Sequence, residues 1–170
     1  MKRMLVILAV FACVTLRAGD FAPAAPQTAA EVLAAFDDVQ ARSGKFTADF
    51  VQTRRTSLLE KDMVSRGRLT MNAPEWLVWE YLSPEKSSRK VDLSADARYA
   101  AIGRKADFSR EVFSGDGCWK IVLTPLKRDL KRLMAVVEVV VDAATMDVMS
   151  AKMTEPSGDY TLIEFKNVER

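Results

Sequence analysis

The twenty residues from Ser65 to Pro84, SRGRLTMNAPEWLVWEYLSP, constrain the fold more than any other stretch of the chain. Apolar and polar side chains alternate on both sides of a central Asn72-Ala73-Pro74 segment, which is typical of two strands that share one apolar face. Proline fixes its own φ angle and has no amide hydrogen, so it belongs in the turn. The residues predicted to share the apolar face are Gly67, Leu69, Met71, Leu77, Trp79 and Tyr81.

This apolar face is large for one short hairpin. Aromatic side chains such as Trp79 and Tyr81 bury roughly 150–250 Å2 each when they are covered. The alternation is compatible with two different ways of covering this face. The face can belong to a closed core under a helix, or it can line a cavity that a ligand enters.

Further alternating segments predict a mainly β protein of about seven or eight antiparallel strands. A strand is predicted from Phe46 to Thr53 and is followed by a polar loop from Thr56 to Asp62. After the hairpin, the charged segment from Glu85 to Lys90 is predicted to be solvated. The remaining strands are predicted from Phe108 to the Gly115-Asp116-Gly117 turn, from Trp119 to Pro125, from Val136 to Val141, from Val148 to Thr154, and through Thr161, Ile163 and Phe165.

Three helices are predicted beside these strands. Apolar residues at helical spacing predict an amphipathic helix over residues 29–43, with a capping pair at Thr28 and Glu31 and a glycine cap at Gly44. A short helix is predicted over residues 95–102. A turn or two of helix is predicted in the basic segment 126–134, whose apolar residues are Leu126, Leu130, Leu133 and Met134.

Residues 1–18 have the pattern of a secretory signal peptide, with a basic start, an apolar run and a cleavage site after Ala18. A weaker site ends at Ala24. Residues 19–28 are then an extended leader, and residues 29–170 are expected to form one domain. Alternatively, the sequence Val10-Phe11-Ala12-Cys13 distantly resembles a lipoprotein box, in which Cys13 would be acylated and become the N-terminus.

Composition excludes several kinds of function. Histidine is absent, which excludes imidazole metal sites and histidine-dependent catalytic triads. The 25 basic and 23 acidic residues nearly cancel, so a nucleic-acid partner is not expected. After cleavage Cys118 is the remaining cysteine, which leaves no disulfide within the chain. The acidic residues at Asp37-Asp38 and from Glu155 to Asp159 are expected on a helix surface and in a turn, so no enzyme activity, metal or cofactor is predicted.

Several motifs, taken in order, resemble the LolA type of periplasmic carriers of outer-membrane lipoproteins. They are a helix leading into Phe46-x-Ala-x-Phe50-x-Gln52, then Gly67-x-Leu69-x-Met71-x-x-Pro74, Trp79-Glu80-Tyr81-x-x-Pro84, Leu123-x-Pro125 and the closing Glu155-Pro156-Ser157-Gly158-Asp159-Tyr160-x-x-Ile163-x-Phe165-x-Asn167. The resemblance covers most of residues 29–168.

The resemblance implies a half-open antiparallel β-barrel with helices across its concave face, an α+β and mainly β fold. It implies a monomeric periplasmic carrier or chaperone for lipid or lipoprotein acyl chains, with an inner-membrane release complex and an outer-membrane acceptor as partners. The implied cavity residues are Phe46, Phe50, Leu69, Met71, Leu77, Trp79, Tyr81, Trp119, Ile121, Leu123, Val137, Val139, Ile163 and Phe165. The implied lid residues are Val32, Leu33 and Phe36.

The chain departs from the family pattern at two places. Ala73 stands where the family has an inward arginine that holds the lid, and the segment after Pro84 is short, which predicts a barrel with one or two strands fewer. Two other uses of the same fold stay open. They are an envelope regulator that binds a protein through Lys127 to Arg132, and an acceptor lipoprotein if Cys13 is acylated.

Overall fold

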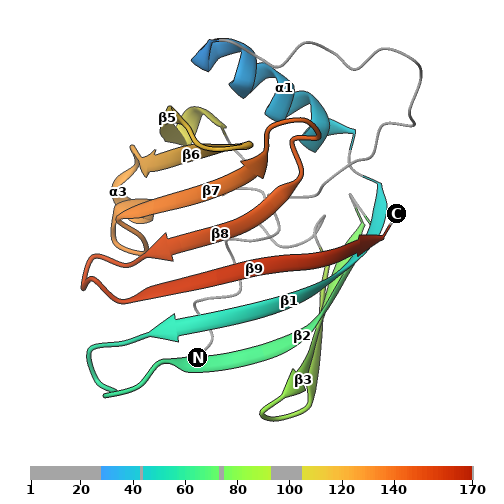
Figure 1. The fold of residues 1–170 in the computed structure, drawn as a ribbon. Helices are drawn as coiled ribbons and strands as arrows, with labels where there is room; N and C mark the ends of the chain where they lie inside the picture. The colour runs from blue at the N-terminus through green and yellow to red at the C-terminus, as the bar shows by residue number, and fades with distance from the viewer. Residues whose placement is uncertain (1–27, 43, 73–74, 93–104, 170) are drawn as a thin grey trace.

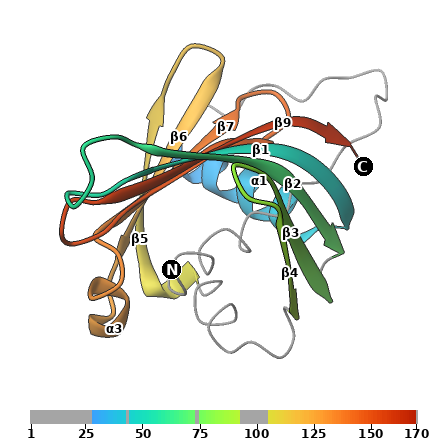
Figure 2. The same ribbon diagram turned by 90° about the horizontal axis from the view of Figure 1, so that it is seen from below.

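The computed structural model describes residues 28–42, 44–72, 75–92 and 105–169. Within these residues, nine strands form one antiparallel sheet in the order β4-β3-β2-β1-β9-β8-β7-β6-β5 (Figure 1). The sheet is open and curved, and helix α1 lies on its concave side (Figure 2). This arrangement confirms the predicted fold class, a mainly β half-open barrel with a helix on the concave face.

The elements have these bounds. The strands are β1 (Lys45–Arg55), β2 (Met63–Asn72), β3 (Trp76–Ser83), β4 (Ser87–Asp92), β5 (Phe108–Ser114), β6 (Cys118–Pro125), β7 (Val136–Asp142), β8 (Val148–Thr154) and β9 (Tyr160–Glu169). The helices are α1 (Ala29–Ala41) and α3 (Arg128–Lys131), with one 3-10 turn at Lys105–Asp107. In the described part of the chain, no helix is long and apolar enough to span a bilayer.

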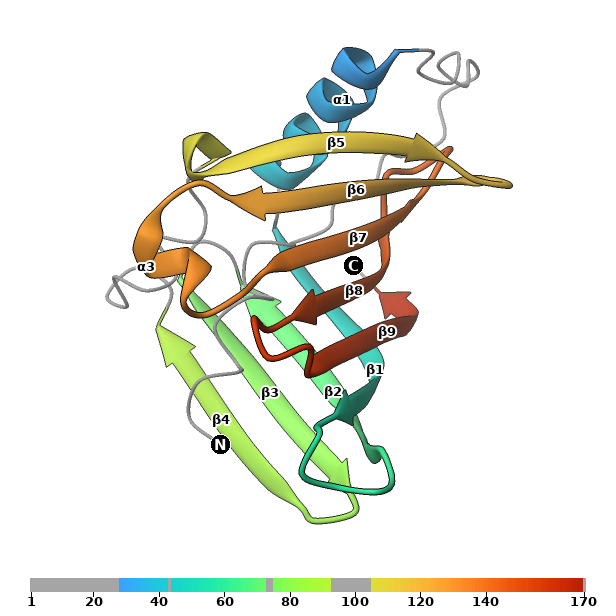
Figure 3. The ribbon, with the colours of Figure 1, turned by 90° about the vertical axis from the view of Figure 1, so that its left-hand side faces the viewer.

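Strand β1 joins the two halves of the sheet, because it pairs with β2 on one side and with the last strand, β9, on the other (Figure 3). In this register Phe50 lies opposite Gly67 of β2 and Phe165 of β9. On the other face of β1, the Asp49 carboxylate accepts hydrogen bonds from Arg68 at 3.1 Å and from Asn167 at 2.9 Å. These hydrogen bonds lower the pKa of Asp49 and tie both neighbours to β1.

Helix α1 begins with the predicted capping pair. The Glu31 amide donates to Thr28 Oγ1 at 3.2 Å, and the Thr28 amide donates to Glu31 Oε2 at 2.8 Å. Both donors lack a partner within the helix itself, so the pair satisfies them reciprocally. Helix α1 ends at Ala41, and Ser43 lies outside the described residues, so the glycine cap at Gly44 stays a prediction.

The predicted hairpins are present. Gly117 has a φ angle of 66°, which a glycine adopts without steric cost, and it turns the chain between β5 and β6 as the Asp-Gly pair predicts. Gly158 has a φ angle of 88° in the turn between β8 and β9.

Three predictions need correction. Ser87–Asp92 is a strand, β4, and not a solvated loop, so the sheet has more strands than predicted. Of its six residues only Val91 is buried, and the apolar signal of a strand is therefore weak. Helix α3 is one turn long, within the predicted turn or two, but Leu126 and Leu133 are exposed instead of sharing a buried stripe with Leu130. Ala73 and the helix predicted over residues 95–102 lie outside the described residues.

Candidate functional site

The concave face of the sheet contains every residue predicted to line a cavity. These residues belong to two hydrophobic clusters. The strand-only cluster, whose described members all come from strands, contains Phe46, Ala48, Phe50, Leu69, Met71, Leu77, Trp79, Val91, Ala151 and Ile163, with Tyr81 and Phe165 packed against it. The helix-packed cluster contains Phe36, Val39, Phe108, Ile121, Leu130, Met134, Val137, Val139, Val141, Met146, Val148 and Met153, with Leu33, Ala35, Trp119, Leu123 and Phe165 packed against it.

Three aromatic rings in the strand-only cluster meet over a glycine. The Phe50 ring lies edge-on to Trp79 and Tyr81, with ring centroids 4.9 and 5.2 Å away. Edge-to-face packing at this distance is favourable beyond the area that it buries. The Phe50 ring fits because Gly67 has no side chain, since a Cβ built there would lie 2.6 Å from the ring and 2.1 Å from the Glu80 carbonyl oxygen. Glycine is therefore required at position 67, where the β2 backbone approaches the Phe50 ring closely.

Two indole N–H groups on this face are buried without a hydrogen-bond acceptor. Among the described residues, the Nε1 atoms of Trp79 and Trp119 have neither a protein partner nor contact with solvent. Buried N–H groups are nearly always paired, because leaving one unpaired costs about 1–3 kcal/mol. One donor belongs to the strand-only cluster and the other packs against the helix-packed cluster, so both halves of the face carry an unused polar group.

Tyr81 contributes a polar group that is already used. Its hydroxyl donates to Gln52 Oε1 at 3.1 Å. Burial raises the pKa of Tyr81 above its ordinary value of 10.0, although the positive charge of Arg89 and the Gln52 hydrogen bond act in the opposite direction. The phenol therefore stays neutral at physiological pH, and this part of the face carries no charge from it.

Helix α1 lies over the helix-packed cluster, with two of the three predicted lid residues, Leu33 and Phe36, in or against that cluster. Val32 is fully buried, Phe36 is 5% exposed and Leu33 is partly buried. Phe36 and Val39 pack in the same cluster as Phe108 of β5 and Ile121 of β6. The helix is thus seated on the β5 side of the sheet.

An ion pair also fastens α1 to the sheet. The Arg110 guanidinium on β5 donates two hydrogen bonds to the Asp37 carboxylate, at 2.7 and 3.1 Å, and Lys105 Nζ lies 3.1 Å from the same carboxylate. The Arg110 and Asp37 side chains are only 22% and 19% exposed. The sequence analysis missed this contact, although Arg110 has the same strand parity as the buried Phe108, and a charge at an inward position is a signal for a buried partner.

The polar residues considered for catalysis have structural roles. Asp37 binds Arg110, Asp38 forms an exposed ion pair with Arg42 one helical turn away, and Asp159 accepts hydrogen bonds from residues 56 and 57. Cys118 is half-buried at the start of β6. In the part of the chain that the structure describes, no group of acidic or sulfur ligands is arranged to hold a metal.

Comparison with known proteins identifies relatives by fold and not by sequence. No protein-family model matches the sequence, and no curated protein matches it. Among solved structures, MucB aligns with a TM-score of 0.52 at 13% identity, over 83% of this chain and 58% of MucB. MucB in the Pseudomonas aeruginosa MucA/MucB complex aligns with a TM-score of 0.50 at 14% identity, over 82% of this chain and 56% of that chain.

A LolA superfamily protein from Nitrosomonas europaea also aligns, over 85% of this chain and 94% of that protein, at 10% identity and a TM-score of 0.39. The chain spans little more than half of the MucB chains that it matches, and at these identities the likeness establishes a shared fold.

Proposed function

We propose that this protein carries acyl chains of lipids or lipoproteins on the concave face of its sheet, beneath helix α1. The observation that supports the proposal most directly is the apolar face formed by the two clusters, which contains two buried indole N–H groups for which the described residues supply no acceptor. An acyl ester or amide supplies both an apolar chain and a carbonyl acceptor for such a donor.

A carrier has to release its acyl chain, and this requirement limits how tightly it can bind that chain. Each buried CH2 group contributes about 0.8 kcal/mol, so a fully enclosed acyl chain would leave slowly. A helix that returns to the same apolar surface after the ligand leaves offsets part of that free energy. The contact of Phe36 with the helix-packed cluster and the Asp37–Arg110 ion pair favour this seated position of α1.

The cellular setting is part of the proposal. Residues 1–18 would be removed as a signal peptide, and residues 29–170 would act as a monomeric periplasmic domain. An inner-membrane complex would supply the acylated cargo, and an outer-membrane acceptor would receive it.

Three tryptophans provide an internal test. Trp79 and Trp119 have the inward parity of their strands, whereas Trp76 is three residues before Trp79 on β3 and lies on the other face, with Lys90 Nζ 4.9 Å from its ring centroid. Three variants, each keeping one tryptophan and carrying phenylalanine at the other two positions, are titrated with a lysophospholipid brominated along its acyl chain. Bromine quenches indole fluorescence on contact, so we expect quenching of Trp79 and Trp119 but not of Trp76.

Equal quenching of Trp76, or no quenching of any tryptophan, contradicts the proposed function. A lysophospholipid with an ether bond in place of the ester keeps the chain but removes the carbonyl. If the indoles bind that carbonyl, the ether analogue binds the wild-type protein more weakly than the ester does. A Trp79→Phe, Trp119→Phe variant should then bind the ester and the ether with equal affinity.

A second function follows from the likeness to MucB, whose structures include a complex with MucA. The same concave sheet can bind a protein segment instead of a lipid, and the protein would then be an envelope regulator. A third role, as an acceptor lipoprotein, requires acylation of Cys13, which lies outside the described residues. The mass of the mature N-terminus distinguishes the acceptor from the other two, and the brominated lipid distinguishes the carrier from the regulator.

A further inference from the structure

One end of the sheet gathers four chain connections. Because neighbouring strands are antiparallel, the segments at residues 56–62, 84–86, 126–135 and 155–159 all lie at the end where α3 lies. Figures 1 and 2 both show α3, the β1–β2 loop and the β8–β9 turn projecting to the same side. We call this edge the α3 end.

Most of the exposed large apolar side chains occur at the α3 end. In the described ranges ten such side chains are exposed, and three of them, Phe113, Met149 and Val168, lie towards the opposite end of their strands. Scattered exposed apolar residues need no explanation, but a concentration at one edge marks an interaction site. The seven at the α3 end are Leu58, Leu59, Met63, Val64, Leu82, Leu126 and Leu133.

The β1–β2 loop holds its leucines outward in a fixed conformation. Asp159 from the β8–β9 turn accepts a hydrogen bond from Thr56 Oγ1 at 3.0 Å and another from the Ser57 amide at 2.9 Å. The Leu59 amide donates to the Thr56 carbonyl at 3.1 Å. Although these bonds order the loop, Leu58 remains 89% exposed. The exposure is therefore built into the loop and does not arise from a lack of structure.

The α3 segment adds positive charge. It contains four basic residues and one acidic residue, Asp129, between Leu126 and Leu133. Lys127 pairs with the buried Asp107 at 2.7 Å, and Leu130, which is 7% exposed, packs into the helix-packed cluster. These two contacts hold the segment against the rest of the protein. Its remaining basic side chains, at Arg128, Lys131 and Arg132, are exposed.

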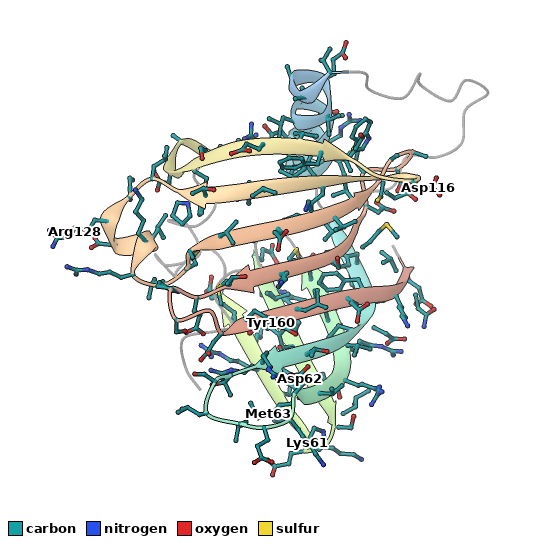
Figure 4. The ribbon with its side chains drawn as sticks, turned by 60° about the vertical axis from the view of Figure 1, so that its left-hand side comes forward. Lys61, Asp62, Met63, Asp116, Arg128 and Tyr160 are labelled. Carbon is teal, nitrogen blue, oxygen red and sulfur yellow. The ribbon has the colours of Figure 1, made fainter. Side chains whose placement is uncertain are left out.

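Figure 4 shows Arg128 directed away from the sheet and Lys61, Asp62 and Met63 where the β1–β2 loop leads into β2. That loop adds no positive charge, because its two acidic residues, Glu60 and Asp62, outnumber Lys61, and Asp62 is paired with Arg55 at 3.0 Å. The electrostatic attraction therefore comes from the α3 segment, and the loop contributes mainly apolar surface.

We propose that the α3 end docks on the surface of a bilayer that contains anionic phospholipids. In this arrangement the leucines enter the boundary between headgroups and acyl chains, and Arg128, Lys131 and Arg132 contact lipid phosphates. A protein partner fits less well, since the core of a protein interface is depleted of charged residues and enriched in aromatic residues. None of the seven exposed apolar side chains is aromatic. This proposal does not depend on acyl-chain binding by the concave face.

Vesicle co-sedimentation tests the docking surface. The purified protein, with its mass showing that Cys13 is not acylated, is mixed with vesicles of phosphatidylcholine alone or of equal parts phosphatidylcholine and phosphatidylglycerol. We expect binding to the mixed vesicles, weaker binding at high salt, and little binding to phosphatidylcholine alone. A basic residue near an anionic surface contributes about a five-fold factor in affinity, so a double Arg128→Glu, Lys131→Glu variant is expected to bind at least roughly ten-fold more weakly.

A double Leu58→Ser, Leu59→Ser variant is expected to lose about ten-fold in affinity for the same vesicles. Its matched control is a double Phe113→Ser, Met149→Ser variant, which changes two side chains that are each 47% exposed away from the α3 end and should bind normally. Circular dichroism checks that each variant is folded. Quenching by the brominated lipid should persist in all variants, which separates this proposal from the proposed function.

Two results overturn the docking proposal. One is that the wild-type protein does not bind the mixed vesicles. The other is that the control variant loses as much affinity as the leucine variant, which would mean that exposed apolar residues anywhere on the molecule suffice. Loss of binding to a purified acidic protein in the Arg128→Glu, Lys131→Glu variant, without any vesicle binding by the wild type, assigns the surface to a protein partner instead.

Discussion

The two clusters on the concave face are held together in different ways. The helix-packed cluster depends on α1, an element outside the sheet, which contributes Phe36 and Val39 and is fastened by the Asp37–Arg110 ion pair. The described members of the strand-only cluster come from strands that are hydrogen-bonded to one another, with the Phe50, Trp79 and Tyr81 rings packed over Gly67.

This difference shows which part of the face can move without loss of the fold. A helix with one apolar stripe and one ion pair can leave its seat while the sheet persists, whereas the residues of the strand-only cluster belong to hydrogen-bonded strands and keep their places for as long as the sheet persists. We therefore expect changes in α1 to alter local opening and changes in the strand-only cluster to alter global stability.

Replacement of Phe50 by alanine has the largest expected effect. Removal of a fully buried aromatic ring typically costs about 3–5 kcal/mol, and Phe50 is 2% exposed. Phe36→Ala removes a ring of the same size from α1, but global stability should fall less because the helix can detach first. Urea unfolding of both variants measures the difference. Equal losses of global stability would show that α1 unfolds only together with the sheet.

Substitution of Gly67 by alanine tests the tight packing under the aromatic rings. A Cβ at this position meets the Glu80 carbonyl at 2.1 Å, so the backbone of β3 has to shift, and we expect a loss of about 1–3 kcal/mol. Gly44→Ala is the matched control, because a Cβ there meets nothing within 4 Å. If thermal unfolding is the same for both variants, the packing of Phe50 over Gly67 does not limit stability.

Loss of the ion pair should release α1 alone. Asp37→Asn leaves the Arg110 guanidinium half-buried without its counter-charge, which is expected to weaken helix docking by about 1.5 kcal/mol. Hydrogen exchange of α1 amides should accelerate, while exchange in β1 to β3 stays unchanged. The neighbouring Asp38→Asn change removes an exposed pair with Arg42 and should cost less than about 0.5 kcal/mol. Faster exchange in β1 to β3 as well would contradict the separation of the two clusters.

Acid should loosen the β1–β2 loop with the smallest effect of the four. The hydrogen bond from the Ser57 amide lowers the pKa of Asp159 below its ordinary value of 3.8. A carboxyl group with a lowered folded-state pKa contributes stability above its unfolded value and loses that contribution as the pH falls through its folded value. Exchange of the Ser57 amide, relative to amides in β7, should therefore increase only at a pH below about 3.8. An Asp159→Asn variant should remove this pH dependence, and its persistence would assign the effect to another group.

The sequence predicted the parts of the fold in which burial alternates strictly. In β2 and β3 the inward residues from Gly67 to Tyr81 were identified because every second side chain is apolar and the other positions are mostly polar. All fourteen predicted cavity residues lie in or against the two clusters for the same reason. Alternation fixes the face of a residue, although it does not reveal what covers that face.

The errors occurred where a segment has few buried residues, where apolar side chains are exposed, or where two contacting residues are far apart in the sequence. Strand β4 was missed because Ser87 to Lys90 are all exposed at the edge of the sheet, so the segment has no alternation to detect. In the segment 126–134 the buried side of the short helix was predicted too wide, because Leu126 and Leu133 are exposed apolar residues. The Asp37–Arg110 pair joins residues 73 positions apart, and the lack of an acceptor for the Trp79 indole depends on all its neighbours in space.

The position of β1 between β2 and β9 has a consequence for how the protein comes to be folded. One neighbour of β1 is the next strand along the chain, while the other is β9, so the two halves of the sheet stay separate until β9 has been synthesised. Pairings across such sequence separations form slowly and leave strand edges exposed in the meantime. Until β9 is made, that edge of β1 can pair with a strand of another molecule, so aggregation competes with folding.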